Sequence, residues 1–212
     1  MRPLSFMAGG KIRIVYSDIG GVLGTNGWGS DLRAKVVEHF GLDEVTVDKR
    51  HHLMFDSYER GYLTFEQYLN YVFFEEPRSF EWTAVRDFIY AGSIPWPESI
   101  HLFRQVKEAN KVKLALISNE GEGITQYRID KFGLRELADF IVVSHCVHMR
   151  KPDAQIWQLA LDLAQVKVDQ AIYVDDREMF VNRATELGFS AFQHVTVEQS
   201  RQNFEALGLK TK

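Results

Sequence analysis

Residues 12–24 read IRIVYSDIGGVLG. The segment from Ile12 to Tyr16 is a short apolar run typical of a buried strand, and it is followed at once by Ser17 and Asp18. Glycine-rich sequence comes next. In open α/β sheets, ligands bind outside the carboxyl ends of the strands. The residues that follow each strand are therefore the first place to look for function.

The second half of the chain repeats this strand pattern. Apolar runs with strand character occupy residues 112–118, 140–144, 171–174 and 190–195, and helical stretches such as residues 153–164 separate them. Strands that alternate with helices imply crossover connections, a parallel sheet and helices on both faces. We therefore predict an α/β fold, a Rossmann-like three-layer sandwich.

The pattern changes after the first strand, where no run has strand character. Helical pieces follow one another instead, at residues 32–40, 47–60, 65–74 and 80–90. Thr64 and Gln67 form a capping-box signature. We predict a small all-helical cap, residues 30–95, inserted into a core domain formed by residues 1–29 and 96–212.

Composition narrows the functional class. The 212 residues include 25 Lys and Arg against 29 Asp and Glu, a net charge of −4, which argues against a dedicated nucleic-acid binder. The single cysteine, Cys146, rules out an intrachain disulfide framework and fits a reducing compartment. No stretch has the apolar length of a transmembrane helix or signal peptide. We expect a cytoplasmic protein that binds neither nucleic acid nor membranes.

Polar groups follow four of the predicted strands. In chain order they are Asp18, Ser118, Asn119, Lys151, Asp175 and Asp176. Adjacent carboxylates at the mouth of a buried strand are unfavourable unless a cation lies between them, and such oxygen ligands suit Mg²⁺. Arg150 and Lys151 precede a helix start, where cations oppose the dipole, so we expect an anionic partner nearby.

Together these groups predict phosphoryl transfer. Asp18 would attack phosphorus and form an aspartyl-phosphate, while Ser118 and backbone N–H groups hold phosphate oxygens. Lys151 would neutralise charge on both the nucleophile and the phosphate. The cap would act as a lid that excludes water. Taken singly, each residue also has an ordinary interpretation as a turn residue, a helix cap or a surface lysine.

The ordered set of motifs resembles the haloacid dehalogenase superfamily. The matching segments are residues 15–23, 116–119, 150–152 and 173–177. Residues 59–64 and 149–156 are also similar to the branch that contains α-D-glucose-1-phosphate phosphatase. The resemblance implies a Mg²⁺-dependent phosphatase that acts on a small phosphorylated metabolite such as a sugar phosphate.

The resemblance also implies residue roles. Asp18 would be the nucleophile, and Ser118 and Lys151 the phosphate-binding pair. The implied metal ligands are Asp18, the backbone carbonyl of Gly20, and Asp176, with Asp175 bound directly or through water. As further substrate contacts we consider Asn119, Trp28 in the glycine-rich loop and Arg60 at the end of a cap helix. His51 and His52 we expect on a cap helix without a metal role.

One departure concerns the proton donor. The family's usual phosphatase motif has a second aspartate two residues after the nucleophile, which protonates the leaving group and then activates water. This chain has Gly20 there, as does the glucose-1-phosphate phosphatase branch. Water or one of several side chains would substitute, and the sequence does not choose among Glu120, Glu122, His145 and His148. An anomeric phosphate, with its better leaving group, would need less help.

Three other functions stay open at this point. A 2-haloacid dehalogenase uses the same aspartate and needs no acid, but the family's dehalogenases lack the paired carboxylates at Asp175 and Asp176. A catalytically impaired binding protein would not need the whole set of polar residues to be retained. Zinc at the cluster from His145 to His148 is disfavoured because no second ligand pair exists.

Overall fold

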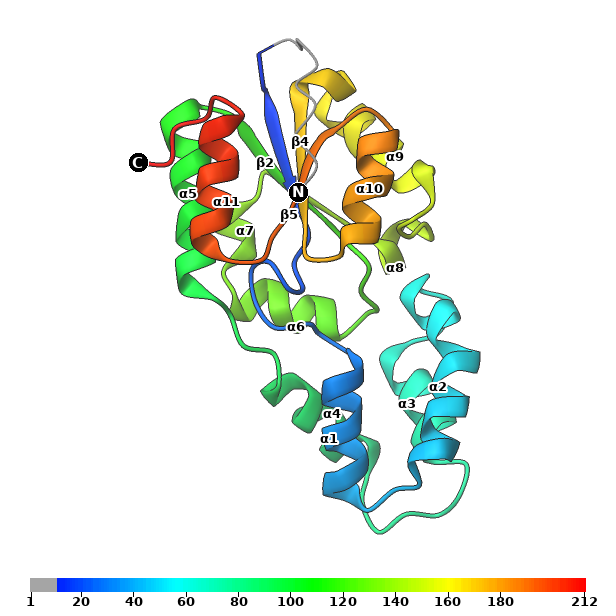
Figure 1. The fold of residues 1–212 in the computed structure, drawn as a ribbon. Helices are drawn as coiled ribbons and strands as arrows, with labels where there is room; N and C mark the ends of the chain where they lie inside the picture. Colours follow the sequence, from blue (N-terminus) through cyan, green and yellow to red (C-terminus); the bar gives the residue numbers. More distant parts are fainter. Residues whose placement is uncertain (1–10) are drawn as a thin grey trace.

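The computed structural model describes residues 11–212 and has two lobes (Figure 1). The first ten residues of the predicted core domain lie outside this range. The larger lobe contains a five-stranded parallel sheet in the order β3-β2-β1-β4-β5. Its strands are β1 (Ile14–Ser17), β2 (Lys113–Ser118), β3 (Phe140–Val143), β4 (Ala171–Asp175) and β5 (Ser190–Gln193).

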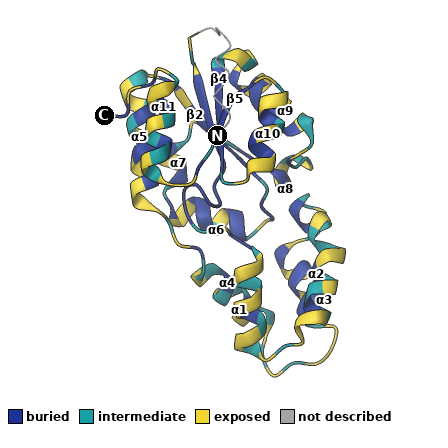
Figure 2. Cartoon of the chain, in the orientation of Figure 1, coloured by how far each residue is buried: buried dark blue, intermediate teal, exposed yellow. Residues whose placement is uncertain are grey.

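Helices cover both faces of this sheet because its strands alternate their side chains between two apolar clusters. Val15 points to the face covered by α5 (Pro97–Asn110), α7 (Leu134–Leu137) and α11 (Val197–Ala206). Its neighbours Ile14 and Tyr16 pack against α9 (Ala154–Ala164) and α10 (Glu178–Glu186) on the other face. Figure 2 shows the strands as a buried layer between these helices. The predicted three-layer α/β sandwich is confirmed.

The smaller lobe is the helical insertion, and it has a core of its own. It consists of α1 (Ser30–Phe40), α2 (Glu44–Glu59), α3 (Phe65–Phe73) and α4 (Trp82–Ala91), so the predicted insertion after β1 is also confirmed. Leu69, Val72 and Ile89 are fully buried in a third apolar cluster that is confined largely to this lobe. The capping box of Thr64 and Gln67 opens α3 as predicted. The domain limits at 29/30 and 95/96 stay predictions.

The two crossings between core and insertion lie side by side. Gly24 and Pro95 form an antiparallel bridge, and the Thr25 N–H donates to the Ile94 carbonyl at 2.9 Å. The chain therefore passes between the core and the helical lobe through one pair of hydrogen-bonded segments.

The remaining elements are short and surround the ends of the strands. They are α6 (Ile124–Lys131), α8 (Ser144–Val147) and the 3₁₀ helix η1 (Val168–Gln170). Helices of three or four residues, α7 and α8 among them, carry no readable periodicity, which is why the sequence did not indicate them. Among residues 11–212, no helix combines the length and apolarity needed to cross a membrane.

Candidate active site

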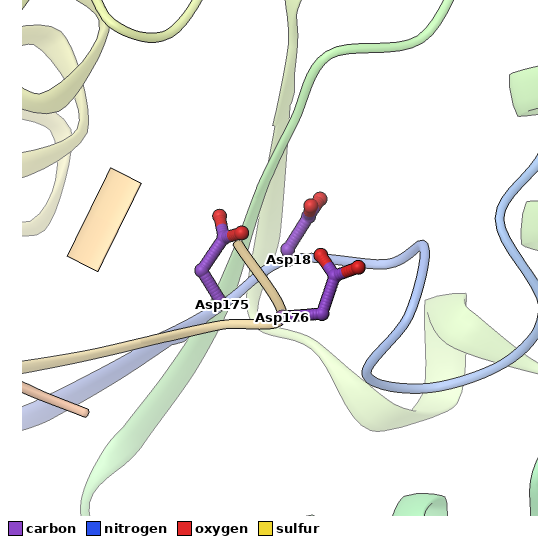
Figure 3. Close-up of side chains that lie close together, drawn as sticks. All are labelled: Asp18, Asp175 and Asp176. Carbon is purple, nitrogen blue, oxygen red and sulfur yellow. The ribbon is translucent and has the colours of Figure 1, made fainter. Parts of the chain in front are cut away.

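The parallel register of the sheet brings together groups that are 100 or more residues apart in the chain. Ser17 of β1 is in register with Leu116 of β2 and with Val174 of β4. Asp18 and Asp175 therefore lie level at one edge of the sheet, and Ser118, the last residue of β2, lies one residue further along. Asp18, Asp175 and Asp176 converge there (Figure 3). One carboxylate oxygen from each lies within 4.8 Å of the others.

Lys151 lies between two of these carboxylates. Its Nζ is 3.0 Å from Asp18 Oδ2 and 2.7 Å from Asp175 Oδ2, and its side chain is wholly buried. Burial alone would lower the pKa of Lys151, but Asp175 and Asp18 raise it above its usual value. The lysine is therefore charged at neutral pH.

Asn119 holds the backbone of Lys151 in place. Its Nδ2 donates to the Lys151 carbonyl and its Oδ1 accepts from the Lys151 N–H, both at 2.8 Å. Asn119 also lines the cavity next to Asp18 and Ser118. Because both polar groups of its side chain form hydrogen bonds with the backbone of Lys151, Asn119 mainly positions that residue.

Asp175 and Asp176 have different surroundings. Asp175 accepts from Lys151, from the Tyr173 hydroxyl and, through Oδ1, from the Arg177 N–H at 2.9 Å. Asp176 Oδ1 is buried without a hydrogen-bond partner. Such an orphaned carboxylate oxygen beside two other carboxylates fits a bound cation.

Gly21, in the turn after β1, leaves room for the side chain of Asp176. Its φ is +68°, and a Cβ there would lie 2.2 Å from Asp176 Oδ2. A side chain at this position would displace Asp176, so only glycine fits the turn.

The electrostatics of the cluster also favour a cation. Burial raises the pKa of Asp18, with the charge of Lys151 opposing this effect and that of Asp175 adding to it. Burial and the charge of Asp18 likewise raise the pKa of Asp176. Three carboxylates face one ammonium, so a divalent cation would neutralise the excess. Within residues 11–212 this is the one convergent group of three such ligands, and the cluster from His145 to His148 does not form another.

A cavity of about 190 Å³ separates this edge of the sheet from the cap. Its floor includes Asp18, Gly20, Ser118 and Asn119. The cap and the glycine-rich loop supply the opposite wall, which includes Trp28, Arg33, His51, Phe55, Tyr58 and Glu59. The cavity is smaller than the several hundred Å³ usual for drug-sized ligands, which favours a small substrate.

Trp28 lies in the cavity wall, where a buried hydrogen-bond network holds it. Its indole N–H donates to the Tyr68 hydroxyl at 2.6 Å, and that hydroxyl lies 2.7 Å from His51 Nδ1. Because Tyr68 accepts from Trp28, its own proton is directed to His51, so we assign the His51 proton to Nε2. Burial lowers the pKa of His51 to about 4, which keeps it neutral.

Arg60 is not among the residues that line this cavity. Its guanidinium lies 3.1 Å from Asp56 and 3.1 Å from Asp153, an ion pair that joins the cap to the core. The structure therefore does not bring Arg60 to the other predicted site residues.

Arg150 has the anionic partner expected from its place before a helix. The partners are two carboxylates of the cap, Asp56 Oδ1 at 2.8 Å from Nη1 and Glu59 Oε2 at 2.6 Å from Nη2. Tyr58 adds a hydrogen bond of 2.5 Å to the Glu122 carbonyl. These contacts hold the cap against the core beside the cavity.

Sequence reasoning missed several residues of the cavity wall. Arg33, His51 and Glu59 are ordinary polar residues of amphipathic helices, and no spacing rule shows that they face Asp18. It named Glu120 among the possible proton donors but missed the buried partner of that carboxylate, Arg128, at 2.5 Å. The one available signal was the motif at residues 59–64, which contains Glu59.

Comparison with known proteins identifies the family. The model of the haloacid dehalogenase-like hydrolases matches residues 32–193. No curated protein gives a significant match. A HAD family enzyme from Bacteroides thetaiotaomicron has a TM-score of 0.79 at 18% identity, over 92% of this chain and 99% of that one.

Two further structures are similar at the level of the fold. The same Bacteroides enzyme in complex with magnesium and inorganic phosphate has a TM-score of 0.73 at 18% identity, over 87% of this chain and 94% of that one. An L-2-haloacid dehalogenase from Xanthobacter autotrophicus has a TM-score of 0.60 at 17% identity, over 95% of this chain and 84% of that one. The α/β core, the helical insertion after β1 and the family match together show that the chain belongs to the haloacid dehalogenase-like hydrolases.

Proposed function

We propose that this hydrolase is a Mg²⁺-dependent phosphatase that acts on a small phosphomonoester through an aspartyl-phosphate on Asp18. The observation that carries the proposal is the position of Asp18, buried on the cavity floor between Lys151 and two further carboxylates. A dehalogenase needs no metal, so the orphaned oxygen of Asp176 favours the phosphatase over that alternative.

The residues present fit a magnesium ion. Asp18, the carbonyl of Gly20 and Asp176 would hold it directly, and Asp175 through water, since both Asp175 oxygens already accept hydrogen bonds. When bound, the ion would neutralise charge on the phosphate and the nucleophile. The similar Bacteroides enzyme binds magnesium and inorganic phosphate, which supports this assignment.

The chain's own residues would orient the nucleophile and the phosphate. Asp18 Oδ1 accepts from the Ile19 N–H at 2.7 Å and Oδ2 contacts Lys151, so the carboxylate cannot rotate freely. Lys151 and Ser118 would hold phosphate oxygens beside it, and the cap would exclude water. Catalysis would then come mainly from positioning and electrostatic stabilisation.

For the substrate we propose a sugar phosphate, with the phosphate on the anomeric carbon. The small cavity supports a small ester, and the absence of an acid at the usual position, that of Gly20, supports one whose leaving oxygen needs less help than a simple alkoxide. The polar and aromatic wall, with Arg33, His51 and Trp28, suits a hydroxylated ring.

Metal removal tests the proposed function. Purified protein with Mg²⁺ is expected to release phosphate from p-nitrophenyl phosphate or from a member of a sugar phosphate panel. EDTA should lower this rate by about 100-fold or more, and excess Mg²⁺ should restore it. Halide release from a 2-haloacid that is indifferent to EDTA, without any phosphate release, would instead show the dehalogenase.

Replacing Gly20 with aspartate tests the account of the leaving group. A Cβ at Gly20 would lie 2.9 Å from Asn26 Oδ1, the end of a side chain that can move away. We expect Gly20→Asp to raise kcat/KM for ordinary alkyl phosphates by about 10-fold or more, with a smaller gain for anomeric phosphates. Equal effects on both classes of ester would contradict the account, and Gly20→Ala controls for the added volume.

A further inference from the structure

The proposed phosphatase lacks a proton donor for the leaving oxygen at the usual position, which Gly20 occupies. Of the side chains that the sequence left open, Glu122, His145 and His148 do not line the cavity. Glu120 does line it, but it follows β2 on the core side together with Asp18, and its Oε1 accepts a hydrogen bond from the buried Arg128 guanidinium at 2.5 Å. The donor must therefore come from another residue of the cavity wall.

The geometry of phosphoryl transfer shows on which side the donor must lie. The attacking and leaving oxygens are roughly in line through phosphorus. Asp18 attacks from the floor, at the end of β1, so the leaving oxygen points to the wall that the cap supplies. The water that later hydrolyses the aspartyl-phosphate must approach from that same side.

Glu59 is the carboxylate that the cap places in this wall. It is the last residue of α2, its exposed fraction is 6%, and it lines the same cavity as Asp18. Its Oε2 is 2.6 Å from Arg150 Nη2, but the contact lacks hydrogen-bond geometry, and Oε2 is buried without a hydrogen-bond partner. The charge of Arg150 offsets part of the cost of burying this carboxylate, but the missing hydrogen bond at Oε2 is an exception that calls for an explanation, such as a catalytic role.

The surroundings of Glu59 keep both of its protonation states accessible. Burial raises its pKa to about 7, while Arg150, Arg177 and Lys151 lower it and Glu120 raises it. In the same wall the pKa of His51 is lowered to about 4 and that of Tyr58 lies well above its usual value. A group that donates and then accepts a proton works best with a pKa near the working pH.

We propose that Glu59 is the general acid and base of this reaction, in the role that Gly20 leaves vacant. This inference rests on the proposed function. In the first step the Asp18–phosphorus bond forms, the bond from phosphorus to the leaving oxygen breaks, and the proton of Glu59 passes to that oxygen. In the second step Glu59 takes a proton from water, whose oxygen bonds to phosphorus as the Asp18–phosphorus bond breaks. Inorganic phosphate leaves, and both carboxyl groups regain their starting states.

The isosteric variant Glu59→Gln tests this role in the Mg²⁺-loaded protein. For an alkyl or sugar phosphate that the wild type hydrolyses, kcat/KM should fall by about 100-fold, because the leaving oxygen lacks its acid. p-Nitrophenyl phosphate needs no acid, so the variant should release one p-nitrophenolate per site in a fast burst. Slow turnover should follow, because water lacks its base. In the wild type, kcat/KM should fall above pH about 7, because Glu59 then loses the proton that it must donate. This fall should be absent in Glu59→Gln.

Asp56→Asn is the matched control, because Asp56 shares Arg150 with Glu59 but does not line the cavity. It should show neither the burst nor the difference between esters. Equal losses on both esters and no burst in Glu59→Gln would overturn the role of Glu59 but not the proposed function. A burst and a difference between the esters in Asp56→Asn would do the same. A wild-type protein that releases phosphate from no ester would overturn the proposed function itself.

Discussion

Asp18→Asn is expected to lower kcat by at least about 10⁴-fold, whichever phosphate ester is used. The amide keeps the shape of the carboxylate but cannot form the aspartyl-phosphate, so the covalent route is lost. Such a loss corresponds to about 5.5 kcal/mol of transition-state stabilisation. Steady-state phosphate release, together with the absence of any phosphorylated protein after a quench, is the measurement.

The fold of this variant should be intact. Lys151 keeps Asp175 at 2.7 Å, and the loss of one like charge relieves Asp175 and Asp176. We therefore expect a Tm within a few degrees of the wild type. Asp31→Asn makes the same chemical change at an exposed position in the first turn of α1 and should leave activity unchanged. An Asp18→Asn protein that retains more than about 1% of wild-type turnover would remove Asp18 as the nucleophile.

Arg128→Met is expected to produce the largest loss of stability, about 3–5 kcal/mol. Arg128 is fully buried on α6, with Nη1 at 2.5 Å from Glu120 Oε1 and Nη2 at 2.6 Å from the Thr25 carbonyl. Its removal leaves the Glu120 carboxylate buried without a counter-charge. For a chain of this length the Tm should fall by roughly 10 °C, measured by thermal unfolding.

The double variant Glu120→Gln/Arg128→Met separates charge from packing. If the uncompensated carboxylate dominates, the double variant should be more stable than Arg128→Met alone. Burial already raises the pKa of Glu120 despite Arg128, and without the arginine it should rise further. A group with a raised folded-state pKa stabilises at low pH and loses that contribution as pH rises. Arg128→Met should thus be more stable at pH 5 than at pH 8; equal stability would contradict this.

The fold was predictable because its determinants are local. The apolar runs of β1, β2 and β4 are each short and almost wholly buried, which is the pattern of strands covered on both faces. The same reasoning placed Asp18, Ser118 and Asp175 together, since parallel strands end at one edge. The sequence also indicated Lys151, because it stands in a loop just before a helix, where a cation opposes the helix dipole.

The cavity wall was not predictable in this way. His51 and Glu59 lie on one amphipathic helix, and the sequence shows neither how that helix is rotated nor which core residues it meets. Arg60 shows the same limit, because its reach to Asp153 depends on how the cap docks. The sequence correctly indicated an anionic partner for Arg150. It did not show that the partners are two carboxylates of the cap.

The central position of β1 has a consequence for how the chain folds. Ile14 is in register with Lys113 and Ala171, which are 113 − 14 = 99 and 171 − 14 = 157 residues later. At roughly 5–20 residues per second, β1 leaves the ribosome about 5–20 s before its first neighbour and about 8–30 s before its second. During this time an apolar strand has both edges unpaired, which is a known route to aggregation. Growth temperature and chaperone supply should therefore affect the soluble yield.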